Sequence, residues 1–371
     1  QHRIRLIMKP DSDLAKNKEQ AEKDRLANIK SSLTEQQKQE IIDSASALKK
    51  RQEMEEDLDI LPKVGLADVP SKINYIETTH RQIEPLPLTT FSAGTNGLVY
   101  QQVVMPFPQL NEQQMQLLPL YSTCVTEMGV GNRDYQQTQL WHSTVVGSYT
   151  ASASVRTDKA ELSKLHANFI LACKGLASNQ QAISELMLES FNLARFDELH
   201  RLKELVAQIL TQRESSVVSN GHALAMIAAS SGLSSYGHLN QRWGGMSGLI
   251  QLRQLNASLA TDEGIQNLSQ QLQEMHQLFL KQPRQYLLVS EKDRLKEFSN
   301  TIEHSFSKEK NGLLANNLID YKPPLQLVNH SWTANTQVSF CAKAFPTVAS
   351  SHPDCAPLTV LGGVLRNGYL N

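Results

Sequence analysis

The first sixty residues have the pattern of a charged helical arm. Residues 16–60 contain neither glycine nor proline. Apolar residues recur there at helical spacing: Ile41, Ile42, Ala45 and Leu48. Thr34 followed by Gln37 is a capping-box signature that marks a helix start, and we expect a break near Ser31 and Ser32. The pattern predicts a helical hairpin, whose narrow apolar stripe suits a connector between domains better than a coiled coil without persistent heptads.

The next stretch predicts strands and two helices. Residues 91–105 have the pattern of a β-hairpin, because Asn96 and Gly97 readily adopt the positive backbone dihedrals of a tight turn. Residues 112–128 place apolar side chains on one face, which predicts a helix that Gly129 ends. Three further elements are predicted in order: a helix at 134–141, a strand at 145–155 and a strand at 165–173.

The rest of the chain predicts mainly helices. In order these segments are helical stripes over 183–209, a helix at 222–229, a glycine-rich loop at 232–248, a helix at 268–279, a strand at 286–289, a helix at 291–304, a polar linker at 305–324, a strand at 336–345 and a helix at 354–370. Helices that cover one face of a mainly antiparallel sheet define an α+β fold. Residues 337–365 repeat the strand, proline turn and helix of 91–129, which predicts the start of a second copy of the same plan.

Composition and charge exclude several classes of partner. At ~100–200 residues per domain, the 371 residues predict two or three domains. Lys and Arg number 36 against 37 Asp and Glu, and this balance predicts no nucleic-acid partner, because such proteins carry a basic excess. The longest apolar stretches fall well short of the ~20 residues of a membrane span, so no membrane partner is expected.

The cysteines and the two ends bear on compartment and completeness. Four cysteines lie far apart without a CxxC pair, which fits neither a zinc ribbon nor a disulfide scaffold. This favours a reducing compartment, either cytoplasm or an organellar matrix. The chain opens without Met on a strand-like run at 1–8, shows no signal peptide, and stops inside a helical pattern. We therefore expect a piece of a longer polypeptide.

A search for motifs finds no complete active site. The sequence contains no GxxxxGK[ST] or GxGxxG loop, no GxSxG elbow, and neither HExxH nor a complete HxxEH. Residues 245–248, Gly-Met-Ser-Gly, predict a flexible loop. Residues 300–304 come nearest to the inverted zinc motif but place Asn300 where the first ligand belongs, which favours a solvated helix end with His304.

Single histidines and cysteines are weak candidates. The histidines are scattered, and His142, His166, His222 and His238 stand beside apolar residues. Cys124 lies on the apolar side of the 112–128 helix and predicts a buried small side chain rather than a nucleophile. Residues and motifs alone therefore favour binding or scaffolding over catalysis, with an unrelated enzyme that uses Cys124 or His222 as a rival hypothesis.

Several stretches carry a family resemblance as a set. In chain order they are residues 34–37, 58–64, 66–70, 95–100, 117–121, 126–129, 339–345 and 352–370. Together they resemble the pitrilysin-type zinc metallopeptidases, in the presequence-protease branch. The first three match the helical linker of that family, the next three match the opening strand and helix of its third domain, and the last two match the start of its fourth domain.

The resemblance implies an architecture and an activity for the parent protein. Such enzymes have four related α+β domains in two halves that enclose a chamber and are joined by a helical hairpin. Their first domain carries HxxEH and a downstream Glu, and the bound zinc lowers the pKa of its water to ~7. The substrate is an unfolded peptide. For this chain the resemblance implies the following domains: 1–15 as the tail of a preceding domain, 16–62 as the linker, 63–307 as the third domain, 308–324 as a second linker and 325–371 as an incomplete fourth domain.

The sequence departs from the family where the chemistry is expected. The zinc-bearing domain is absent, and alignment of Gly129 with the glycine after HxxEH places Leu120, Thr123 and Cys124 at the motif positions. Arg366 and Tyr369 lack the spacing of the substrate-gripping Arg and Tyr of the family's fourth domain.

We therefore predict no catalytic and no metal-binding residue in this chain and leave its substrate-binding residues open. Zinc and the catalytic half are expected in the missing N-terminal part, with an unfolded peptide as the other partner. The alternatives are a structural core-type subunit of the same fold, and an unrelated binding protein.

Overall fold

The computed structural model describes residues 11–54, 65–72, 78–83, 86–312, 317–333 and 338–368, with positions 7, 9, 60, 62 and 63. The chain divides into two compact units, Gln1–Asn74 and Tyr75–Asn371. The predicted strand at 1–8 lies outside the described residues apart from Ile7. The finer domain boundaries stay predictions.

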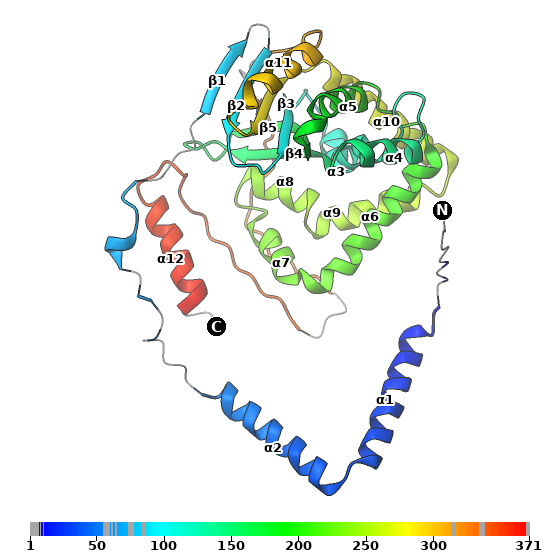
Figure 1. The fold of residues 1–371 in the computed structure, drawn as a ribbon, viewed down its shortest axis with the longest axis vertical. Helices are drawn as coiled ribbons and strands as arrows, with labels where there is room; N and C mark the ends of the chain where they lie inside the picture. The colour runs from blue at the N-terminus through cyan, green and yellow to red at the C-terminus, as the bar shows by residue number, and fades with distance from the viewer. Residues whose placement is uncertain are drawn as a thin grey trace. The chain divides into compact units, whose positions relative to one another are not determined.

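The first unit contains the predicted helical hairpin. Helices α1 (Leu14–Ser32) and α2 (Glu35–Gln52) are joined by a two-residue turn (Figure 1), and the short helix η2 (Leu66–Asp68) follows. The Thr34 hydroxyl accepts from the Gln37 amide N–H at 3.3 Å, while the Gln37 side chain accepts from the Thr34 N–H at 3.0 Å. No residue of α2 is buried, so caps and pairs within each helix supply its local stability.

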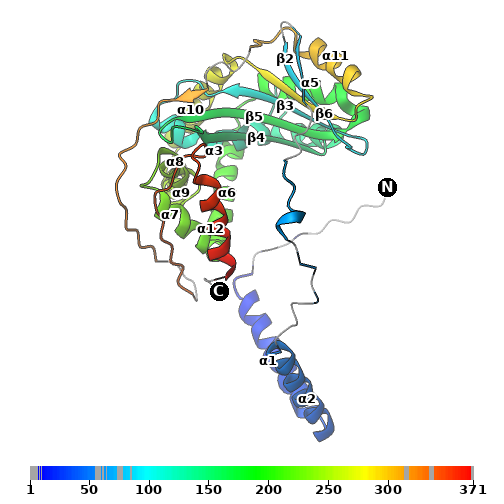
Figure 2. The same cartoon turned by 90° about the vertical axis from the view of Figure 1, so that its left-hand side faces the viewer.

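The second unit is built on one curled sheet. The described strands are β1 (Thr78–Ile83), β2 (Leu86–Ser92), β3 (Leu98–Pro106), β4 (Ser148–Thr157), β5 (Leu165–Leu176), β6 (Gln285–Ser290) and β7 (Leu318–Ile319). Their order is β1-β2-β6-β3-β5-β4, with β7 also on β5. All pairs are antiparallel except β2 with β6, and this confirms the predicted mainly antiparallel sheet. Figure 2 shows α5 and α11 on one side of it.

The helices of this unit lie close to their predicted places. They are α3 (Glu112–Glu127), α4 (Tyr135–Val145), η3 (Ala177–Asn179), α5 (Gln180–Asn192), α6 (Leu199–Ser219), α7 (Gly221–Ser230), α8 (Ser235–Trp243), α9 (Met246–Ser258), α10 (Asp262–Leu280), α11 (Leu295–Phe306) and α12 (Cys355–Gly368). The α+β fold class is confirmed. The core lies between these helices and one face of the sheet, around the fully buried ring of Tyr121, which stacks on Phe279 at a centroid distance of 5.1 Å.

The hairpin predicted over 91–105 is wrong in its pairing but correct in its turn. Asn96 and Gly97 both have positive φ, 51° and 77°, and the Leu98 N–H donates to the Thr95 carbonyl at 3.2 Å. However, β6 lies between β2 and β3 and pairs with both. Turn chemistry is local, whereas strand pairing follows burial, and the distant Tyr286 of β6 is fully buried.

The predicted glycine-rich loop at 232–248 is also wrong. Helix α8 fills most of it, capped by the Ser234 hydroxyl, which accepts from the Gly237 N–H at 3.0 Å, and α9 starts at Met246. A Cβ added at Gly237 would lie 2.4 Å from the Ser230 carbonyl oxygen, and one at Gly248 would lie 2.5 Å from the Arg242 carbonyl oxygen. These glycines therefore permit close packing of helix ends rather than a flexible loop.

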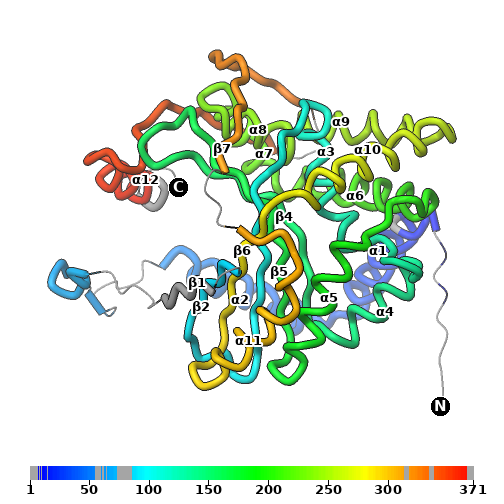
Figure 3. The backbone as a smooth tube through the Cα atoms, turned by 90° about the horizontal axis from the view of Figure 1, so that it is seen from above, coloured from blue at the N-terminus to red at the C-terminus, as the bar shows by residue number. Residues whose placement is uncertain are grey.

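The C-terminal stretch confirms a helix but not the strand before it. Residues 338–345 form no strand, and Val338 and Phe345 are exposed. An alternating pattern favours a strand only where a partner edge is present, and the described part of this stretch has none. Figure 3 traces the stretch as an irregular path that leads to α12. Within the predicted linker at 305–324, β7 extends the edge of β5.

Candidate functional site

Helix α3 is the element with the most unusual local structure. Asn111 caps it and Gln114 completes the capping box, with hydrogen bonds of 2.9 and 3.1 Å. Pro119 lies inside the helix and cannot donate to the carbonyl of Met115 one turn earlier. That carbonyl instead accepts from the indole N–H of Trp243 at 2.8 Å. The proline therefore ties α3 to the end of α8.

The two faces of α3 have different surroundings. One face, with Leu118, Tyr121 and Cys124, is fully buried in the core. The other face lines a cavity of about 520 Å³ that opens to solvent. Residues of α3 at helical spacing contribute to this cavity: Gln113, Gln116, Leu117, Pro119, Leu120 and Thr123. The periodicity that predicts the helix also explains this division, because i, i+3, i+4 and i+7 share one face.

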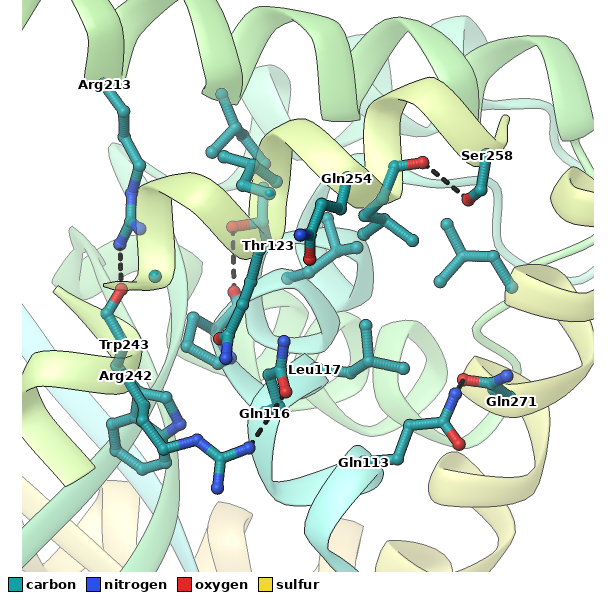
Figure 4. Close-up of a pocket in the computed structure, with 18 of the residues that line it drawn as sticks. Gln113, Gln116, Leu117, Thr123, Arg213, Arg242, Trp243, Gln254, Ser258 and Gln271 are labelled. Atoms are coloured by element: carbon teal, nitrogen blue, oxygen red, sulfur yellow. Dashed lines mark hydrogen bonds between the residues drawn. The ribbon is translucent and has the colours of Figure 1, made fainter. Parts of the chain in front are cut away.

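Helices α6, α8, α9 and α10 supply the other walls. Six carboxamide side chains line the cavity: Gln113, Gln116, Gln251, Gln254, Asn267 and Gln271. Its charged residues, Arg213 and Arg242, are both cationic, and none of the lining residues described is a carboxylate. Figure 4 shows the arginines on one side of the cavity and the hydrogen-bonded pair Gln113 and Gln271 on the other. The cavity is therefore polar, with one positively charged end.

The two arginines differ in how they are held. The Arg242 guanidinium pairs with Glu112 at 2.7 Å and donates to the Gln116 side chain at 3.0 Å. The Arg213 guanidinium donates to the Trp243 carbonyl oxygen, and among the described residues it has no carboxylate partner. Burial lowers the pKa of Arg213 from its usual value, because a partly desolvated cation without a counter-charge is disfavoured.

The residues aligned with the zinc motif are divided between these two faces. Leu120 and Thr123 line the cavity, and the Thr123 hydroxyl donates to the Pro119 carbonyl at 3.3 Å. Cys124 points into the core, where burial raises the pKa of its thiol to about 12. Leucine offers no ligand and a protonated, buried thiol is a poor one. The described residues contain no group of three or more His, Cys, Asp and Glu able to hold a metal ion, so this part of the chain does not fit the zinc ion that the resemblance implies.

The histidines flagged by sequence occupy separate places. His142 is buried, lies 2.9 Å from the Ser190 hydroxyl, and burial lowers its pKa to about 4. His238 Nδ1 lies 2.6 Å from the Tyr321 hydroxyl, and His166 bridges Asp158 and Asn317.

The remaining candidates lie apart from one another. His222 is exposed on α7, and Asn300 and His304 are exposed on α11. Arg366 lies within α12, and Tyr369 is outside the described residues. The structure brings none of these together. Sequence reasoning missed the cavity, although polar Gln113 and Gln116 on an otherwise apolar helix were a signal of it.

The sheet offers a second surface. Along β3 and β5, alternate residues are buried under helices, while Tyr100, Gln102, Ala172 and Lys174 on the other face stay at least partly exposed. Tyr100 lies opposite Lys174 in the register. The described strands therefore have one covered face and one that is open, with small, polar and aromatic side chains on it.

The fold is thus an α+β unit that follows a charged helical hairpin. Residues 8–255 match the family described as associated with the peptidases of metallopeptidase family 16, subfamily C, and the chain belongs to that family. It is 25% identical over 98% of its length to the mitochondrial presequence protease of Yarrowia lipolytica and 26% identical over 92% to presequence protease 1, chloroplastic/mitochondrial, of Arabidopsis thaliana. It covers 37% and 32% of these two proteins. The presequence-protease resemblance is confirmed.

Two solved protease structures also match part of the chain. The first half of the periplasmic protease PqqL from Escherichia coli matches 67% of this chain with 49% of its own, at 14% identity and a TM-score of 0.44. A protease from Helicobacter pylori matches 67% with 53% of its own, at 13% identity and a TM-score of 0.40. In the part of the chain that the structure describes, no helix is long and apolar enough to cross a membrane.

Proposed function

We propose that this chain forms the non-catalytic half of a zinc-dependent peptidase that degrades unfolded peptides, and that it closes the substrate chamber. The observation that carries the proposal is its similarity to presequence proteases along 92–100% of its length, combined with Leu120, Thr123 and Cys124 at the motif positions of α3. The reactive zinc and its general base then belong to a different part of the parent polypeptide.

The sheet suits the role of a chamber wall. Its open face carries partly exposed polar and aromatic groups, such as Gln102 and Tyr100, that can contact a peptide without recognising one sequence. Selection of substrates by size then follows from the shape of the closed chamber. The hairpin of α1 and α2, with its charged surface, acts as the tether between halves. The similarity to presequence proteases named as mitochondrial or chloroplastic supports an organellar matrix as the compartment.

Two alternatives make different predictions. A structural core-type subunit of the same fold would bind a partner subunit and never support peptide turnover. An unrelated enzyme that uses Cys124 or His222 would be active alone, but the Cys124 thiol is fully buried with a pKa raised to about 12, which leaves it without a reactive thiolate. These physical properties favour the non-catalytic half.

A reconstitution experiment tests the proposal. The purified chain is mixed with zinc and a quenched-fluorescent unfolded peptide, alone and together with a separately expressed segment of the parent that carries HxxEH. We expect no turnover and no stoichiometric zinc from the chain alone, and turnover from the mixture. Turnover or tight zinc binding by the chain alone contradicts the non-catalytic role, and a mixture that binds but never cleaves points to the structural subunit.

A further inference from the structure

We propose that the cavity beside α3 binds a short peptide through its free C-terminal carboxylate, with the peptide main chain held by the carboxamides of the walls. The peptide class rests on the proposed function, whereas the position and polarity of the ligand follow from the cavity itself. The site lies between α3, α6, α8, α9 and α10, all within the second unit. Its volume of about 520 Å³ falls in the range of ~300–1,000 Å³ that small-ligand sites occupy.

The arginine end fits a carboxylate. Two guanidinium groups, those of Arg213 and Arg242, meet there with only Glu112 as a counter-charge among the described residues, and the Glu112 side chain is 78% exposed. Arg213 donates to the Trp243 carbonyl oxygen, and a guanidinium has five N–H donors in total. The remaining donors of Arg213 have no partner in the part of the chain that the structure describes. A planar carboxylate can accept two parallel hydrogen bonds from such a group.

The carboxamides fit a peptide main chain rather than a simple anion. Each one offers N–H donors and a carbonyl acceptor, the same groups that a peptide bond presents. The Gln251 Oε1 atom is shielded from solvent and has no hydrogen-bond partner in the described structure. A buried acceptor without a donor carries a free-energy cost. A peptide N–H can satisfy it, whereas phosphate and other fully ionised anions have no N–H to donate.

The apolar lining accounts for the side chains of the ligand. Leucines from α3, α9 and α10 line the cavity: Leu117, Leu120, Leu252, Leu255 and Leu268. They accept apolar side chains of different shapes without a directional requirement. We therefore expect loose sequence preference combined with strict dependence on the terminal carboxylate, as suits the products of peptide cleavage.

Calorimetric titration of the purified chain tests the site. The probes are a mixed-sequence apolar hexapeptide with a free C-terminus, the same peptide with a C-terminal amide, and inorganic phosphate. We expect the free acid to bind at least roughly 10-fold more tightly than the amide, because charge-assisted hydrogen bonds are lost in the amide. Phosphate should not compete at equal concentration. Equal affinity for acid and amide, or displacement of the peptide by phosphate alone, overturns the proposal.

Variants locate the binding in the cavity. Arg213→Gln keeps a donor toward Trp243 but removes the charge, and it should lower affinity for the acid roughly 10-fold while leaving the amide unchanged. Arg253→Gln is the matched control, because Arg253 lies on α9 outside the cavity and pairs with Glu214 at 2.6 Å. It should bind like the parent chain. Binding that survives Arg213→Gln unchanged contradicts the site.

A second variant guards against misfolding. Leu120→Trp fills the cavity from α3 and should abolish peptide binding while circular dichroism remains that of the parent chain. Retained binding by a folded Leu120→Trp chain overturns the proposal. The chain is titrated alone, so a failure of binding in a chain that still restores peptide turnover rejects this site and leaves the proposed function standing.

Discussion

The hairpin of α1 and α2 and the sheet-based unit are stabilised in contrasting ways. In the hairpin, no residue of α2 is buried, and Lys38 pairs with Glu35 across one helical turn at 2.6 Å. In the second unit, Tyr121 is fully buried among rings from β5, α10 and the loop before α6. The hairpin thus relies on interactions within three or four residues, while the second unit relies on contacts between distant segments. Substitutions in the two units should therefore differ in size and in reach.

The largest effect is expected at the centre of the core. Tyr121→Ala removes a ring that stacks on Phe279 and Phe196 and also breaks the 3.0 Å hydrogen bond to His276. Loss of a buried aromatic side chain costs about 3–5 kcal/mol of unfolding free energy. Urea unfolding followed by fluorescence measures it. Tyr100→Ala, on the open face of the sheet with the Tyr100 residue 38% exposed, is the control and should cost less than about 1 kcal/mol. Equal losses would show that Tyr121 is not part of a tightly packed core.

The next effect concerns the proline in α3. Trp243→Phe removes the donor to the Met115 carbonyl and leaves that acceptor without a partner, at a cost of about 1–3 kcal/mol. Pro119→Ala supplies a backbone N–H that can donate to the same carbonyl. We therefore expect the double variant to recover part of the loss, measured by the same urea titration. A purely additive double variant would show that the indole N–H and Pro119 are not coupled through this carbonyl.

These two predictions also show what can be read from sequence. Thr34 with Gln37, and Asn96 with Gly97, act through their own backbone, and the sequence predicts their cap and turn correctly. The place of β6 between β2 and β3 depends on the burial of Tyr286 against residues far along the chain. No local pattern contains that information.

The cavity follows the same division between local and distant information. Its α3 wall is visible as Gln113 and Gln116 on a predicted helix, whereas the walls from α9 and α10 require the tertiary structure. Gly237 and Gly248 show the opposite error, because a close approach between helix ends reads as flexibility when only the sequence is considered.

A smaller and strictly local effect is expected in the hairpin. Thr34→Ala removes the oxygen that accepts from the Gln37 N–H, and loss of such a cap costs about 0.5–2 kcal/mol. Hydrogen exchange should accelerate in the first turn of α2 and remain unchanged in the strands of the second unit. Thr301→Ala, on α11 away from any cap position, serves as a comparison. Faster exchange throughout β3 or β5 would contradict the independence of the two regions.

The smallest effect is a pH dependence at the edge of the sheet. Hydrogen bonds to Asp158 and Asn317 raise the pKa of His166, and the bond to His166 lowers the pKa of Asp158 to about 2. The histidine contribution is therefore full below its unfolded pKa of ~6.5 and is lost as pH rises through the folded value. The aspartate contribution is present above ~4 and is lost as pH falls through about 2.

This contact should be strongest between roughly pH 4 and 6.5. The Ala167 N–H donates to the Asn317 carbonyl at 2.8 Å, so its hydrogen-exchange protection, corrected for intrinsic rates, should fall as pH rises from about 6 to 8. Asp158→Asn should flatten that profile. An unchanged profile in this variant would indicate that the Asp158 and His166 pair does not hold β7 on β5.

The position of β6 has a consequence for biosynthesis. Ser92 at the end of β2 is matched with Ser290 of β6, which leaves the ribosome roughly 200 residues later. At ~5–20 residues per second, the nascent chain spends roughly 10–40 s with the inner edges of β2 and β3 unpaired. Such edges are templates for pairing with other chains, so translation speed and the occupancy of holding chaperones set how much of this protein reaches its native sheet.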